Sequence, residues 1–262
     1  MEDVSVEKTA IISGGASGIG KAAALKLAGA GFRVCLLDVN DTKLTEVKKE
    51  MEDKAYKVMT IPCDISDYDQ VKMAAKKMME QWGRIDVVFA NAGIVGQTAS
   101  IESMSIENWI NVHNINLNGT FFLVKASIPH VKKQGGSIII TSSVSGNRVF
   151  SQAGFTAYST SKAAQAAFAK MAALELAKYH IRVNVICPGG IETDFSKSIK
   201  RSQDLEEIKV PVAFPEGSKP LDKRSGKPEE VANLVKFLAT DESSHITGTE
   251  IYIDGAESLL IG

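Results

Sequence analysis

Short apolar runs alternate with longer amphipathic segments along the 262-residue chain, and this order limits its fold more than any other feature. The runs are rich in β-branched residues and end at Gly, Pro, Asn or Asp, as buried strands do. We expect strands at residues 9–13, 33–38, 57–61, 86–90, 137–141, 182–186 and 250–253. Helix-period segments lie between them, at about 18–30, 41–53, 67–82, 107–133, 156–179 and 228–239. Repeated strand–helix order predicts an α/β fold with a doubly wound parallel sheet and helices on both faces.

Composition narrows the possible partners. The chain has 30 Lys and Arg against 31 Asp and Glu, so it lacks the basic excess expected of a nucleic-acid or anionic-membrane partner. Cys35, Cys63 and Cys187 are far apart and lie in apolar runs, which indicates reduced thiols and a cytoplasmic protein. No apolar run reaches the ~18 residues of a membrane span, and the four histidines have no metal-ligand spacing.

One segment interrupts the alternation. Residues 193–227 are polar, contain Pro211, Pro215 and Pro220, and show no convincing strand. A long irregular segment inside a compact domain is either a disordered insert or a functional lid. Because it follows the carboxyl end of a predicted strand, where open α/β sheets bind ligands, we favour a substrate lid within a single domain of residues 1–262.

A glycine-rich loop joins the first predicted strand to the first helix, at residues 13–20 (SGGASGIG). Glycines there let the backbone turn tightly and let a pyrophosphate approach the helix N-terminus, whose free N–H groups favour anions. The same stretch is close to a P-loop, since Gly15, Gly20 and Lys21 fit that pattern. However, Ala22 stands where a Ser or Thr hydroxyl would hold Mg²⁺. A dinucleotide-binding protein and a nucleotide triphosphatase are therefore the alternatives.

An acid ends the second predicted strand, eighteen residues after Gly20. Asp38 is placed there to accept hydrogen bonds from the adenosine ribose hydroxyls and to repel a 2′-phosphate. Its alternative role is a cap for the helix that follows. Ser17 in the glycine loop is uncharged, so no cation there invites a phosphate. Together these residues favour NAD over NADP.

A possible acid–base residue lies near the start of the fifth predicted helix. Tyr158 and Lys162 have the i, i+4 spacing that puts a phenol and an ammonium on one helix face. A free tyrosine titrates at about 10, so a nearby Lys⁺ and a cationic nicotinamide would have to lower its pKa by ~2–3 units. One loop separates Tyr158 from a strand that ends in Thr141, Ser142 and Ser143, so hydroxyls and phenol can meet at the carboxyl edge of the sheet.

The same spacing occurs a second time, at Tyr68 and Lys72. Tyr68 follows Asp64 and Asp67, and neighbouring acids disfavour a phenolate. We therefore interpret Tyr68 as a residue on a solvated helix face and Tyr158 as the candidate base.

Taken together, these motifs resemble those of the short-chain dehydrogenase/reductase family over the whole chain. The glycine loop is similar to that family's T-G-x₃-G-x-G, and Asn91-Ala92-Gly93 is similar to its N-N-A-G. Segments 188–193 and 247–255 resemble its nicotinamide-binding segment and its C-terminal strand signature. The residues that match its catalytic tetrad are Asn116, Ser143, Tyr158 and Lys162.

The resemblance implies a Rossmann-type fold of about seven strands and an NAD(H)-dependent oxidoreductase that interconverts a secondary alcohol and a ketone. Tyr158 would exchange the proton, and Ser143 would bind the substrate oxygen. Lys162 would lower the tyrosine pKa and hold the nicotinamide ribose, and Asn116 would hold a relay water. The implied cofactor contacts are Gly14, Ser17, Gly18, Ile19, Gly20, Asp38, Asp64, Ile65, Asn91, Ala92, Gly93, Tyr158, Lys162, Pro188, Gly189, Ile191 and Thr193.

Some positions depart from the family pattern. Ser13 replaces a threonine, and Ala90 and Ala256 replace an asparagine and a glycine. The serine lies 15 positions before Tyr158 instead of 13, which leaves Ser142 and Ser145 as alternatives to Ser143. Asn116 alone could equally cap or kink its long helix.

The substrate is less well defined by the sequence. Phe150, Phe155, Phe195 and Phe214 lie in loops expected to face the pocket, and Phe150 and Phe195 are the expected apolar contacts beside Ser143 and Tyr158. Arg148 is either a partner for a substrate carboxylate or a solvated residue. A 3-oxoacyl-thioester reductase and a non-catalytic NAD-sensing or scaffold protein are the alternatives. By resemblance we expect a homotetramer, or else a dimer, formed through the helices at 107–133 and 156–179 and the C-terminal strand.

Overall fold

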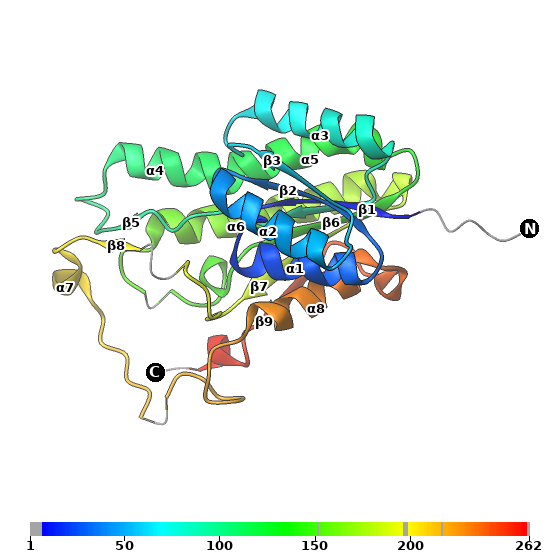
Figure 1. Cartoon of the computed structure of the whole chain (residues 1–262). Coiled ribbons are helices and arrows are strands. Elements are labelled where there is room, and N and C mark those ends of the chain that lie inside the picture. The colour runs from blue at the N-terminus through cyan, green and yellow to red at the C-terminus, as the bar shows by residue number, and fades with distance from the viewer. Residues whose placement is uncertain (1–6, 151, 196–198, 216, 261–262) are drawn as a thin grey trace, which may run out of the picture.

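The computed structural model describes residues 7–150, 152–195, 199–215 and 217–260. Its central sheet has seven strands, all parallel, in the order β3-β2-β1-β4-β6-β7-β9 (Figure 1). The strands are β1 Thr9–Ser13, β2 Arg33–Asp38, β3 Val58–Pro62, β4 Val87–Ala90, β6 Gly136–Thr141, β7 Ile181–Pro188 and β9 Glu250–Ile253. The prediction of a doubly wound parallel sheet is confirmed, and each expected strand lies within two residues of its predicted position.

Helices cover both faces of this sheet (Figure 1). One face carries α1 Gly18–Gly29, α2 Asp41–Asp53 and α8 Pro228–Ala239. The other face carries α3 Tyr68–Trp82, α5 Gly119–Val131 and α6 Thr156–Leu176. Helix α6 continues into a 3₁₀ turn at Ala177–Tyr179. Each face therefore has its own hydrophobic core.

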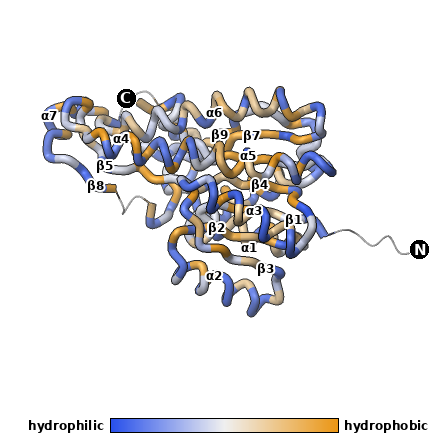
Figure 2. The backbone as a smooth tube through the Cα atoms, turned by 90° about the horizontal axis from the view of Figure 1, so that it is seen from above, coloured by the Kyte–Doolittle hydropathy of each residue, from blue (hydrophilic) through white to orange (hydrophobic). Residues whose placement is uncertain are grey.

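The inner strands β1, β2, β4, β6 and β7 are largely buried on both sides, which explains why they are mostly apolar instead of alternating, whereas the edge strands β3 and β9 are partly exposed. In β1, Ala10 and Ile12 pack against one core while Ile11 packs against the other. In Figure 2, β4 is drawn mainly in hydrophobic colours near the centre, whereas α2 alternates between hydrophilic and hydrophobic colours. Fully buried side chains such as Phe89 hold these layers together, and truncating one to alanine typically costs ~3–5 kcal/mol.

The helix expected at 107–133 is interrupted in its middle. Helix α4 spans Ile106–His113, a π-helical turn spans Asn114–Asn118, and α5 follows directly. A π turn accommodates an extra residue in the helix, and such turns are frequent at functional sites. We missed this turn because the helix keeps its direction, and one extra residue shifts the apolar positions only partly in a segment that is apolar on much of its surface.

The segment at 193–227 contains a strand that its sequence did not predict. Lys200–Arg201 (β8) pairs in parallel with Gln97–Thr98 (β5), and a short helix, α7, follows at Leu205–Ile208. The carboxylate of Asp204 accepts hydrogen bonds from Ser100 N–H (3.1 Å) and the Ser103 hydroxyl (2.5 Å). The side chains of Ser100, Ser103 and Ser202, together with this backbone bond, hold the pKa of Asp204 well below its usual range. Residues 199–208 are therefore attached to the loop that follows β4.

Candidate active site

The carboxyl ends of the central strands open into a cavity of about 450 Å³. Strand β1 lies between β2 and β4, which is where the chain order of the sheet reverses. Open α/β sheets bind ligands at this switch point, and the volume lies within the roughly 300–1,000 Å³ typical of ligand cavities. The cavity is therefore the candidate active site.

The glycine loop forms one wall, and its shape depends on missing side chains. Gly14 and Gly18 have φ values of +66° and +51°, in the left-handed region that favours glycine. A Cβ at Gly20 would lie 2.0 Å from the carbonyl oxygen of Gly14, so no larger residue fits there. Gly20 does not line the cavity itself; it lets the start of α1 pack against the loop.

Asp38 lies at the end of β2 beside this loop. Its carboxylate accepts hydrogen bonds from Ala16 N–H (3.1 Å) and Asn40 N–H (3.0 Å). The cap of α2 is Asn40, whose side chain accepts from Lys43 N–H (3.0 Å), so Asp38 is not the helix cap. Lys43 also lines the cavity, and sequence reasoning missed this cation because it considered only the glycine loop. Its signal was its place in the first turn of the helix that follows Asp38.

Asn91 joins three strand ends. Asn91 N–H and Ala92 N–H donate to the Ser13 hydroxyl at 3.0 and 3.1 Å. The Asn91 amide donates to the Ser13 carbonyl (3.2 Å), and the Thr141 hydroxyl donates to the Asn91 amide oxygen (3.2 Å). Ser13 and Thr141 line the cavity and were not predicted as site residues. Serine at position 13 thus retains a hydroxyl that orders the backbone after β4.

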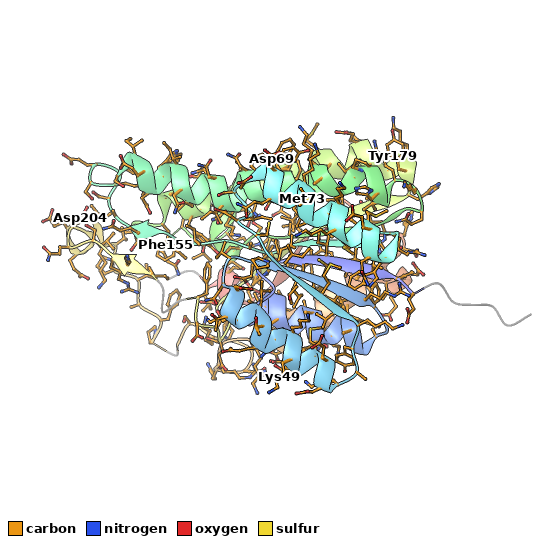
Figure 3. All side chains as sticks on the ribbon, turned by 45° about the horizontal axis from the view of Figure 1, so that its top comes forward. Lys49, Asp69, Met73, Phe155, Tyr179 and Asp204 are labelled. Atoms are coloured by element: carbon orange, nitrogen blue, oxygen red, sulfur yellow. The ribbon has the colours of Figure 1, made fainter. Side chains whose placement is uncertain are left out.

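The candidate acid–base group lies at the start of α6. Tyr158 is 9% exposed and Lys162 is 3% exposed, and both line the cavity. The Tyr158 hydroxyl is hydrogen-bonded to the Ser143 side chain. Lys162 Nζ donates to the Thr141 carbonyl (2.8 Å) and lies 5.6 Å from the centre of the Tyr158 ring. Figure 3 shows the direction of the helix, which leads from Phe155 beside the site to Tyr179 at the other end of the molecule.

Burial decides how these two groups titrate. It raises the pKa of Tyr158 to about 12, and the Ser143 hydrogen bond only partly opposes it. Burial also lowers the pKa of Lys162 to about 7. Among the protein's own groups, the loss of solvation is thus the main cause of both shifts. The lowering of the tyrosine pKa by Lys162 together with a cationic nicotinamide stays a prediction.

Three serines compete for the role beside Tyr158, and their bonds differ. The Ser142 hydroxyl donates to the Lys162 carbonyl (2.7 Å), so it faces the helix backbone. Ser145 does not line the cavity, and its N–H donates to the Ser143 hydroxyl (3.1 Å). The geometry therefore favours Ser143.

Asn116 lies inside the π turn and is fully buried. Its amide oxygen accepts from Ile94 N–H (2.8 Å), and its amide nitrogen donates to the Ile94 carbonyl and the Ser161 hydroxyl, both at 2.9 Å. It does not line the cavity. Asn116 thus braces the segment after β4 against α6.

The predicted cofactor contacts are otherwise brought together. All of them except Gly20 line the cavity. The chain also contributes lining residues that sequence reasoning missed: Ser13, Leu37, Val39, Lys43, Cys63, Ile94, Ile115, Thr141 and Asp194. Most of them are adjacent in the sequence to a predicted residue. The sequence indicated these segments but not which of their side chains face the cavity.

The expected substrate contacts divide into two groups. The Phe195 ring lines the cavity 6.2 Å from the Tyr158 ring, and the Phe155 ring lies edge-on to Tyr158 at 6.1 Å. Phe150 is 69% exposed and lies outside the lining, as does Phe214. The loop turns back before Phe150, because the N–H groups of residues 148 and 149 both bond to the carbonyl of residue 144.

Arg148 and Tyr68 both lie outside the cavity lining; Arg148 is exposed, in line with its interpretation as a solvated residue, whereas the interpretation of Tyr68 needs correction. Arg148 stacks on the Tyr252 ring, with its guanidinium carbon 3.3 Å from the ring centre, and is not part of the cavity lining. Tyr68 is half-buried instead of solvated, with its ring 5.4 Å from that of Phe122, because α3 packs beside α5. Tyr68 does not line the cavity.

Comparison with known proteins identifies the class. A family model described as enoyl-(acyl carrier protein) reductase matches residues 14–256. The chain is 38% identical to 3-oxoacyl-[acyl-carrier-protein] reductase FabG of Thermotoga maritima, over 95% of this chain and 96% of the relative. The chain belongs to the short-chain dehydrogenase/reductase family, and it is an oxidoreductase that uses a nicotinamide cofactor.

Solved structures agree with this assignment. A 3-ketoacyl-ACP reductase from Sinorhizobium meliloti 1021 superposes with a TM-score of 0.92 at 39% identity, covering 97% of this chain and 100% of that one. Carveol dehydrogenase from Mycobacterium avium, in complex with NAD, has a TM-score of 0.86 at 28% identity and covers 98% and 99%. None of the helices in the described part of the chain is both long and apolar enough to cross a membrane.

Proposed function

We propose that this protein is an NAD(H)-dependent enzyme that interconverts a secondary alcohol and a ketone on a single domain. The observation that carries the proposal is one cavity that joins the glycine loop, Asp38 and the hydrogen-bonded pair of Tyr158 and Ser143. A base, a hydroxyl donor and a nucleotide-binding wall are the parts that such a reaction needs.

The roles follow from the positions of these side chains. In alcohol oxidation Tyr158, as phenolate, takes the hydroxyl proton, and in ketone reduction its phenol returns that proton to the oxygen. Ser143 donates a hydrogen bond to the same oxygen and orients it. Lys162, fixed by the Thr141 carbonyl, holds the nicotinamide ribose. When bound, the nicotinamide supplies the hydride acceptor or donor, and its oxidised form adds a positive charge that favours the phenolate.

Asp38 supports NAD over NADP. Its carboxylate is fixed at the ribose end of the cavity by two backbone N–H groups, and a 2′-phosphate there would meet a negative charge. The relationship to carveol dehydrogenase, whose structure contains NAD, is consistent with this choice. Lys43 lines the same cavity and would partly offset the repulsion.

A second candidate is a 3-oxoacyl-thioester reductase. The relatives from Thermotoga maritima and Sinorhizobium meliloti are named for that activity, at 38% and 39% identity. Apolar rings at Phe155 and Phe195 beside Tyr158 suit either an acyl chain or another apolar body. The segment at 193–227 would form the lid over this side in both cases.

Exposed apolar side chains support the expected homo-oligomer, a tetramer or a dimer. They lie on α4, α5 and α6, the helices assigned to contact between subunits: Trp109, Ile110, Phe121, Met171 and Leu174. Apolar patches of this kind mark interaction surfaces in soluble proteins. The proposal also includes a small-molecule substrate and a cytoplasmic location, with further copies of this chain as the subunit partners.

A turnover screen would test the proposal. NADH and NADPH fluorescence would be followed with sugars, hydroxy acids, steroids and acyl thioesters, together with the corresponding ketones. We expect NADH-linked turnover of an apolar secondary alcohol or ketone. NADPH-linked turnover confined to 3-oxoacyl thioesters would favour the second candidate, and cofactor binding without turnover of any class would favour a sensing role.

A further inference from the structure

Helix α6 buries a large polar side chain, Gln165, on the face that also carries Tyr158 and Lys162 and that is otherwise rich in alanine. The buried alanines of this helix are Ala157, Ala166, Ala169, Ala172 and Ala173. Gln165 lies among them and is 0% exposed. It comes one turn after Lys162 and two turns after Tyr158, so all three side chains share a helix face. A buried amide without partners would cost ~1–3 kcal/mol, so its hydrogen bonds matter.

Gln165 donates into the π turn that precedes α5. Its amide nitrogen donates to the Asn116 carbonyl (2.8 Å) and to the Thr120 hydroxyl (2.7 Å). The Thr120 hydroxyl donates to the same carbonyl at 2.7 Å. A carbonyl oxygen can only accept, so the amide group must face it with its nitrogen. The side chains of Gln165 and Thr120 thus both donate to the Asn116 carbonyl, which lies in the π turn where the helix changes its register.

The π turn connects in turn to the catalytic cavity. The Asn116 side chain holds both the N–H and the carbonyl of Ile94. The neighbouring Gly93 lies over the Lys162 ammonium, since a Cβ on it would be 3.4 Å from Nζ and 3.1 Å from the Asn116 amide oxygen. Asn116 also donates to the Ser161 hydroxyl, which itself donates to the Tyr158 carbonyl (2.7 Å).

We propose that Gln165 is a positioning residue, which fixes the π turn so that Asn116 holds the Gly93–Ile94 segment over Lys162. This inference rests on the proposed function of the cavity. Gln165 touches neither cofactor nor substrate; it acts through Asn116. Its removal therefore disturbs the Tyr158–Lys162 end of the cavity and leaves the glycine loop and Asp38 intact.

The test compares Gln165→Leu with a control that loses a similar bond elsewhere. The Ser137 hydroxyl is 1% exposed and donates to the Leu238 carbonyl (2.7 Å) at the amino end of β6, the end of the sheet opposite the cavity. Ser137→Ala thus removes a buried side-chain-to-carbonyl bond without touching the site. The readouts are kcat, the NADH dissociation constant and the urea midpoint.

We expect Gln165→Leu to lower kcat roughly tenfold to hundredfold, as a small displacement of catalytic groups does, while NADH affinity changes less than about threefold. Ser137→Ala should lower the urea midpoint and leave kcat within about twofold. An unchanged kcat in Gln165→Leu, or an equal loss of kcat in Ser137→Ala, would overturn the proposal.

Gln165→Glu gives a second test if the leucine variant does not fold. A protonated carboxylic acid can donate to the Asn116 carbonyl, whereas a carboxylate can only accept and would repel it. Activity relative to the unchanged protein should therefore be higher at pH 6 than at pH 8, and a ratio independent of pH would contradict the proposal. Tyr158→Phe distinguishes failure of the Gln165 proposal from failure of the proposed function. Normal turnover in that variant would refute the proposed function itself.

Discussion

Strand ends and the glycine loop shape the side of the cavity that we propose to bind the cofactor, whereas contacts between loops hold the segment that we propose as the substrate lid, and the residues of those contacts do not line the cavity. The first side consists of the glycine loop and strand ends, joined by bonds such as those of Asp38 and Asn91. The lid on the second side is held by the two-residue pair of β5 and β8 and by Asp204. The difference suggests that one side keeps its form in related enzymes while the other adapts to the substrate.

Tyr158, at the junction of the two sides, should give the largest effect. Tyr158→Phe removes the hydroxyl that transfers the proton, and we expect kcat to fall by about 10²–10⁴. Steady-state turnover followed by NADH fluorescence would measure it. Tyr68→Phe is the matched control, because Tyr68 has the same spacing to a lysine but lies outside the cavity. Equal losses in the two variants would show that the position of the phenol is unimportant.

Asp38 tests the cofactor side. Asp38→Ala removes the negative charge that disfavours a 2′-phosphate, so the NADPH-to-NADH ratio of kcat/KM should rise roughly tenfold to hundredfold. Lys43→Ala in the same background should reverse part of this gain, since Lys43 is then the charge that faces the phosphate. An unchanged ratio in Asp38→Ala would mean that the strand-end acid does not select the cofactor.

The burial of Lys162 can be tested by the free energy of unfolding of the protein without cofactor, measured at several pH values. Its pKa is about 7 in the folded protein and near 10.5 when unfolded, so between these values the unfolded chain binds one more proton. Lys162 should therefore make stability rise with pH in this window, by on the order of 1 kcal/mol per pH unit. Burial raises the pKa of Cys35, Cys63 and Cys187, so these thiols act in the opposite direction where the unfolded chain loses their protons. Tyr158 does not interfere below pH 10, because burial raises its pKa to about 12.

Urea unfolding at pH 7, 8 and 9 would measure this slope. Lys162→Met removes this titrating group and keeps the three cysteines, so the stability of the variant should rise less, or fall more, from pH 7 to pH 9 than that of the unchanged protein. Identical slopes for the two proteins would mean that Lys162 is solvated and titrates normally.

The same division between the two sides appears in what the sequence could predict. Strand order, helix faces and the cofactor wall follow from periodicity and from motifs that bring their own backbone geometry. Lys43 escaped prediction because it lies outside the hydrophobic pattern. The π turn escaped because it shifts that pattern by one residue without ending the helix. The exposure of Phe150, the stacking of Arg148 on Tyr252 and the burial of Tyr68 depend on contacts between distant segments, which spacing along the chain does not reveal.

The smallest effect is expected at Asp204, which tests whether the loop contacts matter on the substrate side. Asp204→Asn keeps the size of the side chain but removes the charge that strengthens its bonds to Ser100 and Ser103. A weaker attachment of the lid should raise the substrate KM roughly twofold to fivefold while NADH affinity stays unchanged. Glu206→Gln is the control, since its carboxylate contacts only the exposed Lys209 among the described residues. If both variants raise KM equally, the effect comes from charge on the segment and not from the Asp204 attachment.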